Sequence, residues 1–343
     1  MRRSLIVLAG LLAAALVWAF LLAHPPGGGP SESSVRVWRT GPREVERLVY
    51  RDGSAEVALE PDWSKGGNAP LIWVHTARPR PAPKPGQSAG RQKAGAKAES
   101  GGMLETVFRG NAAAADLLRR FSTLEARRAI GNLKQLDGEA FGLPAPERTL
   151  RLELSGGREP LELEIGGATY GDLMRYGQQP QSGSVYLFQE ALFGRLKRAR
   201  ATLFDRGLFP FPVQTAARIR ISSAGAAKEL WRLGGGNPPR WGAGPGDGEG
   251  SQAFAAFVNV LTKLKAVLYL PREDASGVGG VAPAMEIELF GEEGGAPRAW
   301  LRIFPGEGGV TNARSSHTIR MVRVSNHLAS RVLDQGGKLL KAP

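Results

Sequence analysis

The sequence predicts an α+β protein in which a single N-terminal transmembrane helix is followed by two tandem similar lobes of mainly antiparallel sheet with covering helices. Three observations lead to this prediction: an uninterrupted apolar run near the amino terminus, short alternating segments separated by Gly-containing turns, and a set of elements that recurs in the second half. Because alternating strands have one apolar side to bury, we expect helices to cover one face of each sheet.

The predicted membrane helix lies at the start of the chain. Arg2 and Arg3 precede an apolar run of 19 residues, Leu5–Ala23, and about 20 helical residues cross a hydrocarbon core. Residues 1–23 are therefore predicted to be a cytoplasmic start and a transmembrane anchor. The positive residues place the amino terminus in the cytoplasm and the body in the periplasm, on a bacterial inner membrane crossed once. The alternative is a cleaved secretory signal, whose apolar region usually spans only about 7–15 residues.

The rest of the chain divides into a tether, two lobes, an insertion and a tail. A Pro/Gly/Ser-rich stretch follows the anchor and is expected to hold the body off the bilayer. A second low-complexity stretch has almost no apolar side chains and is predicted to be a disordered insertion. The predicted divisions are 24–44 for the tether and first strand, 45–213 for the first lobe, 77–103 for its insertion, 214–335 for the second lobe and 336–343 for a basic tail.

The two lobes are predicted to contain the same elements in the same order. Each begins with two strands, continues with an amphipathic helix, and then has a hairpin and a last strand that leads into a helix. In the first lobe the predicted strands are 45–50, 55–59, 149–154 and 161–165, and the predicted helices are 112–128 and 189–200. In the second lobe the predicted strands are 217–222, 228–233, 284–290 and 298–304, and the predicted helices are 252–267 and 326–333.

Composition and charge exclude several classes of chemistry. The chain has no cysteine, which excludes disulfides, thiolate metal sites, thiol nucleophiles and a lipid-modified cysteine anchor. The net charge is +13, but residues 77–103 and 314–343 carry +5 each, whereas residues 104–313 carry +2. This distribution fits contact with anionic lipid or an acidic partner, or a solubilising role. No nucleic-acid binding is expected, because the body has no concentrated basic face with interleaved aromatic residues.

Metal-binding and nucleophilic residues give weak signals. The four histidines, His24, His75, His317 and His327, do not have the three- or four-residue spacing that places two metal ligands on one helix face. The sequence also contains no nucleophile elbow, no S-x-x-K pair and no phosphate-binding loop with a terminal Lys-Ser/Thr. The histidines are therefore interpreted as solvated or hydrogen-bonded surface residues.

Glycine clusters, paired carboxylates and tryptophans also have structural interpretations. The clusters at Gly234–Gly236 and Gly242–Gly250 fit turns between strands. Two carboxylate pairs lie opposite apolar strand faces and are expected on the solvent side of the sheets: Glu162/Glu164 and Glu286/Glu288. Five tryptophans in or beside apolar strands are expected to pack in the core or between the lobes rather than stack on sugars: Trp63, Trp73, Trp231, Trp241 and Trp300. We therefore predict no catalytic, cofactor-binding or metal-binding residues and no cofactor.

Five short blocks carry a resemblance to a known family. They are Glu139–Pro146, Thr149–Leu154, Leu161–Gly166, Ser184–Phe188 and Leu203–Phe209, and they include a Gly-Leu-x-x-Pro turn into a strand. In these blocks the chain resembles the bacterial family called domain of unknown function 4340. The motifs are structural rather than catalytic. The resemblance implies a membrane-anchored accessory partner of ABC-type export systems related to gliding-motility transporters.

The anchor, the repeated sheets and the weak chemical signals predict a non-enzymatic periplasmic accessory or scaffold subunit of an inner-membrane ABC-type transport or envelope machine. Its expected partners are a membrane-embedded ABC transporter or related envelope proteins, together with inner-membrane lipid. One alternative is a peptidoglycan or polysaccharide binding module, which exposed tryptophan faces would favour. A further alternative is an envelope hydrolase, which converging carboxylates in a deep cleft would favour.

Overall fold

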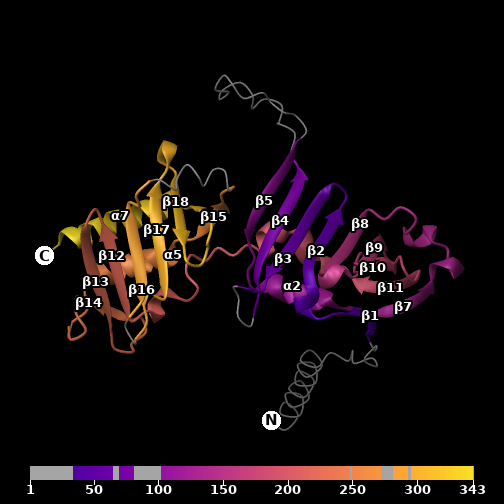
Figure 1. Cartoon of the computed structure of the whole chain (residues 1–343), viewed down its shortest axis with the longest axis horizontal. Coiled ribbons are helices and arrows are strands. Elements are labelled where there is room, and N and C mark those ends of the chain that lie inside the picture. The colour runs from indigo at the N-terminus through magenta and orange to yellow at the C-terminus, as the bar shows by residue number, and fades with distance from the viewer. Residues whose placement is uncertain are drawn as a thin grey trace, which may run out of the picture.

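Strands dominate the body and form three antiparallel sheets with few helices, so the chain is α+β as predicted (Figure 1). The computed structural model describes residues 34–64, 69–80, 102–247, 249–271, 281–292 and 295–342. The predicted anchor, Leu5–Ala23, lies outside the described residues, as does most of the predicted insertion 77–103. Within the described ranges, no helix combines the length and the apolar character needed to cross a membrane.

The first sheet has nine strands in the order β5-β4-β3-β2-β8-β9-β10-β11-β7. The strands are β2 (Val45–Asp52), β3 (Ala55–Asp62), β4 (Leu71–Pro79), β5 (Met103–Arg109), β7 (Arg128–Asn132), β8 (Arg148–Leu154), β9 (Leu161–Ala168), β10 (Met174–Gln179) and β11 (Ser184–Gln189). The helices of this lobe are α2 (Ala112–Ser122), α3 (Ala191–Lys197) and α4 (Ala199–Thr202). Phe193 of α3 stacks on Tyr50 of the sheet and on Phe121 of α2, so both helices share one core with the sheet.

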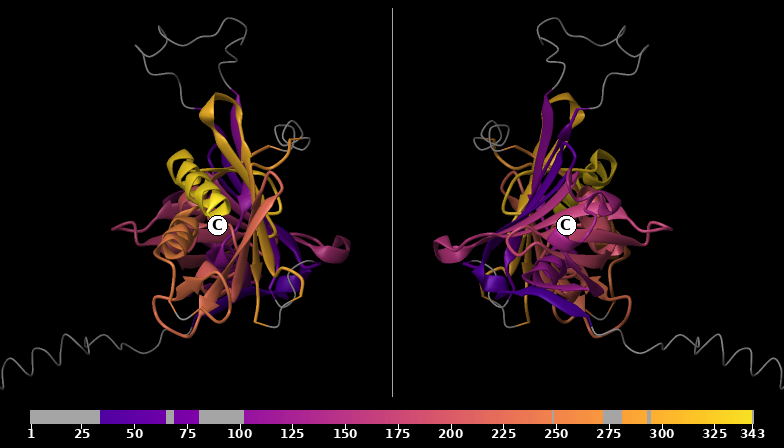
Figure 2. Two further views of the ribbon diagram at one scale, coloured as in Figure 1. Left: turned by 90° about the vertical axis from the view of Figure 1, so that its left-hand side faces the viewer. Right: turned by 90° about the vertical axis from the view of Figure 1, so that its right-hand side faces the viewer.

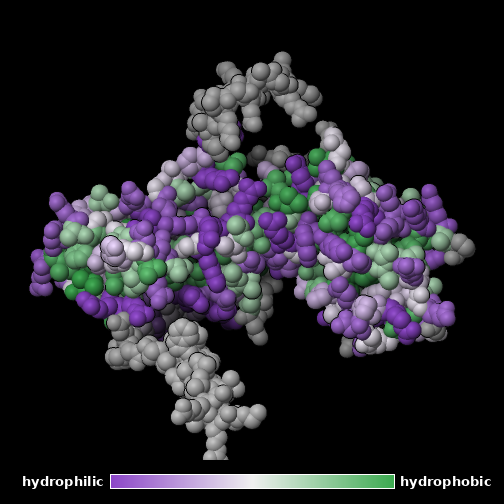
Figure 3. Space-filling model, turned by 180° about the vertical axis from the view of Figure 1, so that it is seen from behind, coloured by the Kyte–Doolittle hydropathy of each residue, from purple (hydrophilic) through white to green (hydrophobic). Residues whose placement is uncertain are grey.

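The second sheet has eight strands in the order β14-β13-β12-β16-β17-β18-β19-β15. They are β12 (Arg218–Ser223), β13 (Ala226–Leu233), β14 (Arg240–Gly242), β15 (Ala266–Tyr269), β16 (Met285–Phe290), β17 (Ala299–Pro305), β18 (Thr311–Ser315) and β19 (Val322–Val324). Figure 2 shows α5 (Gln252–Lys263) and α7 (Asn326–Lys341) side by side on the same side of this sheet. Seen from behind, both lobes carry mainly hydrophilic side chains, with apolar ones in separate patches (Figure 3).

Short elements complete the described part of the chain. β1 (Val35–Arg39) and β6 (Thr123–Ala126) form a separate two-stranded antiparallel sheet next to the first one. The 3₁₀ helices are η1 (Pro42–Glu44), η2 (Leu133–Gln135), η3 (Glu139–Phe141), η4 (Ser155–Gly157), η5 (Val213–Thr215) and η6 (Glu307–Gly309). The predicted boundary between residues 213 and 214 lies within η5.

The two large sheets follow one strand order. The sequence β4-β3-β2-β8-β9-β10-β11-β7 in the first sheet corresponds, strand by strand, to β14-β13-β12-β16-β17-β18-β19-β15 in the second. Helix α2 precedes β7 in the chain, and α5 precedes β15 in the same way. The alternation that predicted the hairpins is visible in β8, where Leu150 and Leu152 are fully buried and Arg151 between them is exposed. The first sheet differs by one additional strand, β5, at the edge next to the second lobe.

Both long amphipathic helices are shorter than predicted. The expected helix 112–128 ends at Ser122, because residues 123–126 turn outward and pair with β1, which buries Leu124 and Ala126. The expected helix 252–267 ends at Lys263, because Ala266–Tyr269 forms the edge strand β15 against β19. In both places buried apolar residues continue past the end of the helix into the following strand. The spacing of apolar residues in the sequence therefore does not show where the helix ends and the strand begins.

The remaining differences concern the helix ends and strands that the sequence did not reveal. The predicted helix 189–200 is divided into α3 and α4, and β5, β7, β10 and β18 were not predicted. The predicted basic tail 336–343 is wrong, because α7 continues to Lys341. Gly336 lies against Met285 and Phe257, where a side chain would collide with them, and Leu339 is 5% exposed. The end of the chain therefore belongs to the core of the second lobe.

Removal of the Leu339 side chain tests this packing. We expect Leu339→Ala to lower the free energy of unfolding by about 2–5 kcal/mol, because the buried leucine leaves a cavity between α7 and its neighbours. Urea unfolding followed by tryptophan fluorescence and circular dichroism measures the change. Lys341→Ala, on the exposed side of the same helix, is the matched control and should change stability by less than about 0.5 kcal/mol. Equal effects of the two substitutions would contradict a packed carboxy-terminal helix.

Candidate functional site

The histidines that were considered as metal ligands lie apart from one another in the described part of the chain. His75 Nε2 is 3.0 Å from a carboxylate oxygen of Glu60 on the neighbouring strand, and His327 is exposed on α7. His317 lies between the two lobes, and His24 lies outside the described residues. Among the described residues, no group of three His, Asp or Glu side chains is arranged to hold a metal ion.

The paired carboxylates form ion pairs across strands. Glu162 lies 2.6 Å from Arg151 of β8, and Glu286 of β16 lies 2.8 Å from Arg302 of β17. Burial raises the pKa of Glu164, and the charge of Glu162 beside it raises it further. These carboxylates follow the exposed faces of their strands, so they stabilise the sheets and do not converge on a cleft.

The tryptophans are buried or have an arginine over the ring. Trp241 is 1% exposed in the core of the second lobe. The remaining four lie 4.0–5.5 Å from a guanidinium carbon: Trp63 beneath Arg43, Trp73 beneath Arg320, Trp231 beneath Arg218 and Trp300 beneath Arg302. Such cation–π contacts hold the rings in place within the protein.

The glycine-rich loop before α5 closes on its own aspartate. Asp247 Oδ2 accepts hydrogen bonds from the backbone amides of Ala243 and Gly244, at 2.5 and 2.9 Å. A phosphate would need free amides of this kind. The loop therefore carries its own anion and serves as the turn between β14 and α5.

The most exposed apolar side chains form the tip of the β9–β10 hairpin. Tyr170 is 106% exposed and Leu173 is 75% exposed, whereas large apolar residues elsewhere in the described ranges are at most 46% exposed. Between them, Gly171 and Asp172 have φ of 84° and 55°, and the Asp172 amide donates to the Thr169 carbonyl at 3.1 Å. This tight turn holds both apolar side chains outward. We call the segment from Tyr170 to Leu173 the hairpin tip.

A preceding turn supports the hairpin tip from one side. Gly166 of β9 lies directly against the Phe141 carbonyl, and a Cβ at residue 166 would be 2.3 Å from that oxygen. Gly142 has φ of 63° and closes η3 against the same strand. The ring of Phe141 also contacts Tyr176 of β10 edge-on, with centroids 4.6 Å apart. The Gly-Leu-x-x-Pro block and the Gly that ends the next strand thus meet, and their function is to hold this hairpin.

Charged residues fix the base of the hairpin. The Glu190 amide donates to the Leu173 carbonyl at 2.9 Å, and its carboxylate lies 2.9 Å from Arg175 Nε and 2.8 Å from Lys197 Nζ. Burial alone would raise the pKa of Glu190, but the hydrogen bonds from Lys197 and Arg175 outweigh it and hold the pKa below its usual range. Arg148 joins this network to the first strands of the lobe. These contacts therefore fix the base of the hairpin on which the tip stands.

A second cluster, the junction, connects the two lobes through Asp205. Its carboxylate lies 2.8 Å from His317 Nε2 of the second lobe and 3.6 Å from Arg109 Nε at the end of β5, and it accepts a hydrogen bond from the Gly207 amide at 2.9 Å. Arg109 also donates to the His317 carbonyl. Burial would raise the pKa of Asp205, but the hydrogen bonds from His317 and Gly207 and the charge of Arg109 lower it.

Aromatic rings surround the junction on its buried side. Tyr269 of β15 contacts Trp73 of β4 and Phe204 edge-on, with centroid distances of 6.2 and 5.6 Å, so rings from both lobes interlock. β5 and β15 are neighbours at the facing edges of the two sheets (Figure 1). Burial raises the pKa of Tyr269, and the nearby Asp205 charge adds to this effect.

Sequence analysis did not identify the hairpin tip or the junction. Tyr170 and Leu173 lie in a Tyr-Gly-Asp-Leu segment. The Gly-Asp pair between two large apolar residues is a sequence signal for a tight turn with apolar side chains at its tip. Asp205 lies in the Leu203–Phe209 block, which carries part of the family resemblance but does not itself indicate a function for Asp205. Its partners are 96 and 112 residues away in the chain, so no spacing rule reveals them.

A family model described as domain of unknown function (DUF4340) matches residues 111–280. The matched range includes α2, the support of the hairpin, the hairpin tip, Asp205 and α5. Comparisons with curated proteins and with solved structures give no match.

Gly166→Ala tests the support of the hairpin tip. We expect this substitution to lower the free energy of unfolding by about 1–3 kcal/mol, because its Cβ collides with a backbone oxygen that cannot move freely. Gly194→Ala, in α3 with no atom within 4 Å of the added Cβ, should leave stability unchanged or raise it by up to about 1 kcal/mol. Differential scanning calorimetry compares the two variants. A neutral Gly166→Ala would show that the turn and strand are not in contact.

Asp205→Asn tests the junction through its pH dependence. The pKa of Asp205 is lower in the folded protein than the roughly 3.9 of a free aspartate. Its stabilising effect is therefore complete above about pH 4 and is lost as the pH falls through the folded value. We expect Asp205→Asn to be less stable than the wild type at pH 7, and the difference to shrink as the pH falls below about 4. Thermal unfolding at each pH measures it, and a constant difference would contradict an ionised junction.

Proposed function

The chain belongs to the DUF4340 family, and we propose that it is a non-enzymatic accessory and scaffold subunit of an inner-membrane ABC-type transport or envelope machine. In this proposal residues 5–23 anchor it as a single-pass membrane protein, and the two tandem similar lobes stand on the periplasmic side. The link to ABC-type, gliding-motility-like systems comes from the family resemblance. The proposed partners are the membrane-embedded transporter or related envelope proteins and inner-membrane lipid.

The hairpin tip carries this proposal. Tyrosine is one of the residue types that dominate protein–protein interfaces, and the exposed leucine beside it enlarges the apolar surface of the tip. Gly166 and Glu190 fix the base of the hairpin, and the Thr169–Asp172 hydrogen bond closes its turn, so a partner that encloses Tyr170 would have less of the loop to order. We infer that the tip enters an apolar pocket on the partner.

The junction supports a scaffold function. A scaffold must present its surfaces at fixed distances, and the bonds of Asp205 to both lobes resist rotation of one lobe against the other. The Asp205–His317 pair also differs from the acid–base pair of a hydrolase. In such an enzyme the second ring nitrogen contacts the nucleophile's hydroxyl, whereas His317 Nδ1 is buried and has no hydrogen-bond partner among the described residues.

A cavity beside Trp63 favours a second candidate, the peptidoglycan or polysaccharide binding module. It has a volume of about 530 Å³ and is lined by Pro42, Arg43, Trp63, Leu118 and Arg119, among others. This volume is in the range of small-ligand sites, and a tryptophan in the wall suits a sugar ring. Titration of soluble peptidoglycan fragments against the wild type and Trp63→Ala separates the candidates, because a glycan-binding module would lose heat of binding in the variant.

Substitution of the hairpin tip tests the proposed function. We expect Tyr170→Ala and Leu173→Ala each to weaken recovery of the membrane partners by about 2–4 kcal/mol of binding free energy, because truncation of a central apolar anchor costs this much. Mild-detergent affinity purification of the tagged full chain, followed by quantitative mass spectrometry, measures recovery. Their thermal unfolding should match the wild type, since both side chains are exposed.

Val281→Ala is the control for this experiment, since Val281 is an exposed apolar residue of the second lobe. It should leave recovery of the partners unchanged. Single Ala substitutions of Glu162, Glu164 and Glu286 test whether any of these carboxylates has a chemical role. If one of them leaves the complex intact and abolishes the cellular phenotype, that carboxylate has a chemical role and the scaffold function is wrong.

A further inference from the structure

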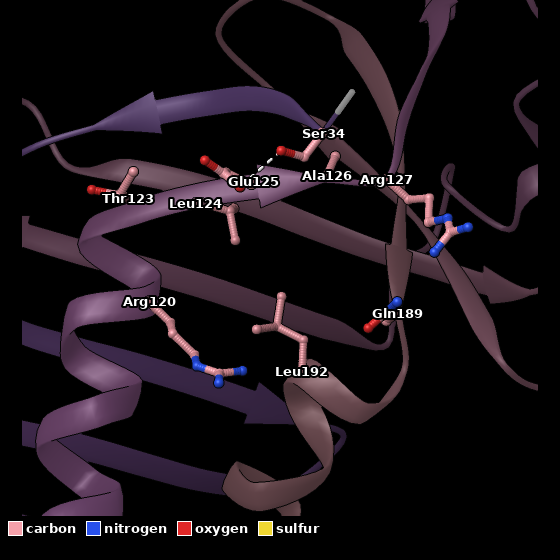
Figure 4. Close-up of a pocket in the computed structure, with 9 residues that line it drawn as sticks. All are labelled: Ser34, Arg120, Thr123, Leu124, Glu125, Ala126, Arg127, Gln189 and Leu192. Carbon is pink, nitrogen blue, oxygen red and sulfur yellow. Dashed lines mark hydrogen bonds between the residues drawn. The ribbon is translucent and has the colours of Figure 1, made fainter. Parts of the chain in front are cut away.

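A cavity opens in the first lobe next to the point where the described chain begins. It has a volume of about 390 Å³ and lies between the end of α2, strand β6 and the start of α3. Figure 4 shows Leu124 and Leu192 approaching each other across it, with Arg120 and Gln189 on opposite sides. The wall therefore combines an apolar middle with a cation at one end and an amide at the other.

The position of the cavity relates it to the proposed membrane anchor. Ser34, the first described residue, lies in its wall, and its hydroxyl donates to Glu125 at 2.9 Å. Residues 24–33 separate Ser34 from the end of the predicted anchor, and ten residues span at most roughly 35 Å. With residues 5–23 in the bilayer as proposed, this segment keeps the cavity within roughly 35 Å of the bilayer surface.

The rim of the cavity is basic. Arg120 of α2 and Arg127 just before β7 line it. Further exposed arginines lie next to wall residues: Arg36 and Arg39 are opposite Glu125 and Thr123 in the strand pairing, and Arg128 follows Arg127. Glu125 is the acidic residue of the wall, and it accepts from Ser34 and lies directly opposite Arg36 in the strand pairing. Arg120 makes no ion pair with any described residue, and its guanidinium points toward the cavity in Figure 4. This face is complementary to a negatively charged surface.

We propose that this cavity binds the headgroup of an anionic phospholipid from the bilayer that holds the anchor. The lipid phosphate accepts hydrogen bonds from the Arg120 guanidinium, the half-buried Leu192 contacts the glycerol carbons, and the Gln189 amide at the far end donates to a headgroup oxygen. The surrounding arginines add long-range attraction to the anionic surface. The proposal rests on the membrane anchoring in the proposed function. It adds a lipid class, a site and a fixed side of the first lobe that faces the bilayer.

The absence of cysteine permits a direct test in the full chain. Thr123→Cys, in the cavity wall, is labelled with a fluorophore, and the protein is reconstituted into vesicles of phosphatidylcholine with or without 30% phosphatidylglycerol. A small fraction of the lipid carries a nitroxide on its headgroup and quenches nearby fluorophores. We expect quenching at about 0.1 M salt to be several-fold greater with phosphatidylglycerol than without it. Arg120→Glu should abolish this difference, and Arg120→Lys should retain part of it.

Control experiments distinguish a failure of the proposed lipid site from a failure of the proposed membrane anchor. Arg240→Glu changes an exposed arginine on β14 of the second lobe and should not affect quenching, and thermal unfolding should show that Arg120→Glu remains folded. Equal quenching in both lipids, or quenching that Arg120→Glu does not alter, overturns the lipid site while the protein stays in the membrane. Release of the full chain by alkaline carbonate would instead refute the anchor and, with it, the reason to place the cavity at the bilayer.

Discussion

The arrangement of the two lobes depends on one ionised carboxylate that is largely removed from water. Asp205 receives donors from its own loop, from the end of β5 and from the second lobe, through Gly207, Arg109 and His317. A buried charge is tolerated only while its partners are present, and loss of one partner is costly. Displacement of either lobe would leave this carboxylate short of donors, and the interlocked rings of Trp73 and Tyr269 would separate at the same time. The position of the second lobe relative to the first is therefore set at the junction.

Carboxylates of the kind found in catalytic and anion-binding sites hold strands and loops together in this protein. Glu162 and Glu286 bind arginines across strands, and Asp247 occupies the amides of its own glycine-rich loop. In contrast, Tyr170 and Leu173 at the hairpin tip and Arg120 beside the cavity near Ser34 are exposed. The tip and the cavity both lie in the first lobe, one on a supported turn and the other beside the start of the described chain. This separation suits a protein that contacts a partner and a bilayer at different places.

The sequence predicted the hairpins and the order of elements because strand alternation is local. Leu150 and Leu152 are buried on one face and Arg151 is exposed on the other, so the pattern of β8 could be interpreted without knowledge of its neighbours. Helix ends were missed because Leu124 and Tyr269 are buried in strands that directly follow helices. The predicted helix 326–333 is too short, because Gly336 continues the helix and packs against Met285. The junction depends on residues distant in the chain, and single-sequence patterns contain no information on such contacts.

Strand β5 is the one element of the first sheet without a counterpart in the second. It carries Arg109 to the junction and brings the edge of its sheet next to β15. Repeats that stack through identical edges can extend into open arrays. Here the edge that receives the second lobe is made by a strand that the second lobe lacks, and the far edge of that lobe is the three-residue strand β14. The edge that receives the second lobe and the far edge of that lobe therefore differ in the described part of the chain, so the pair of lobes is asymmetric from end to end.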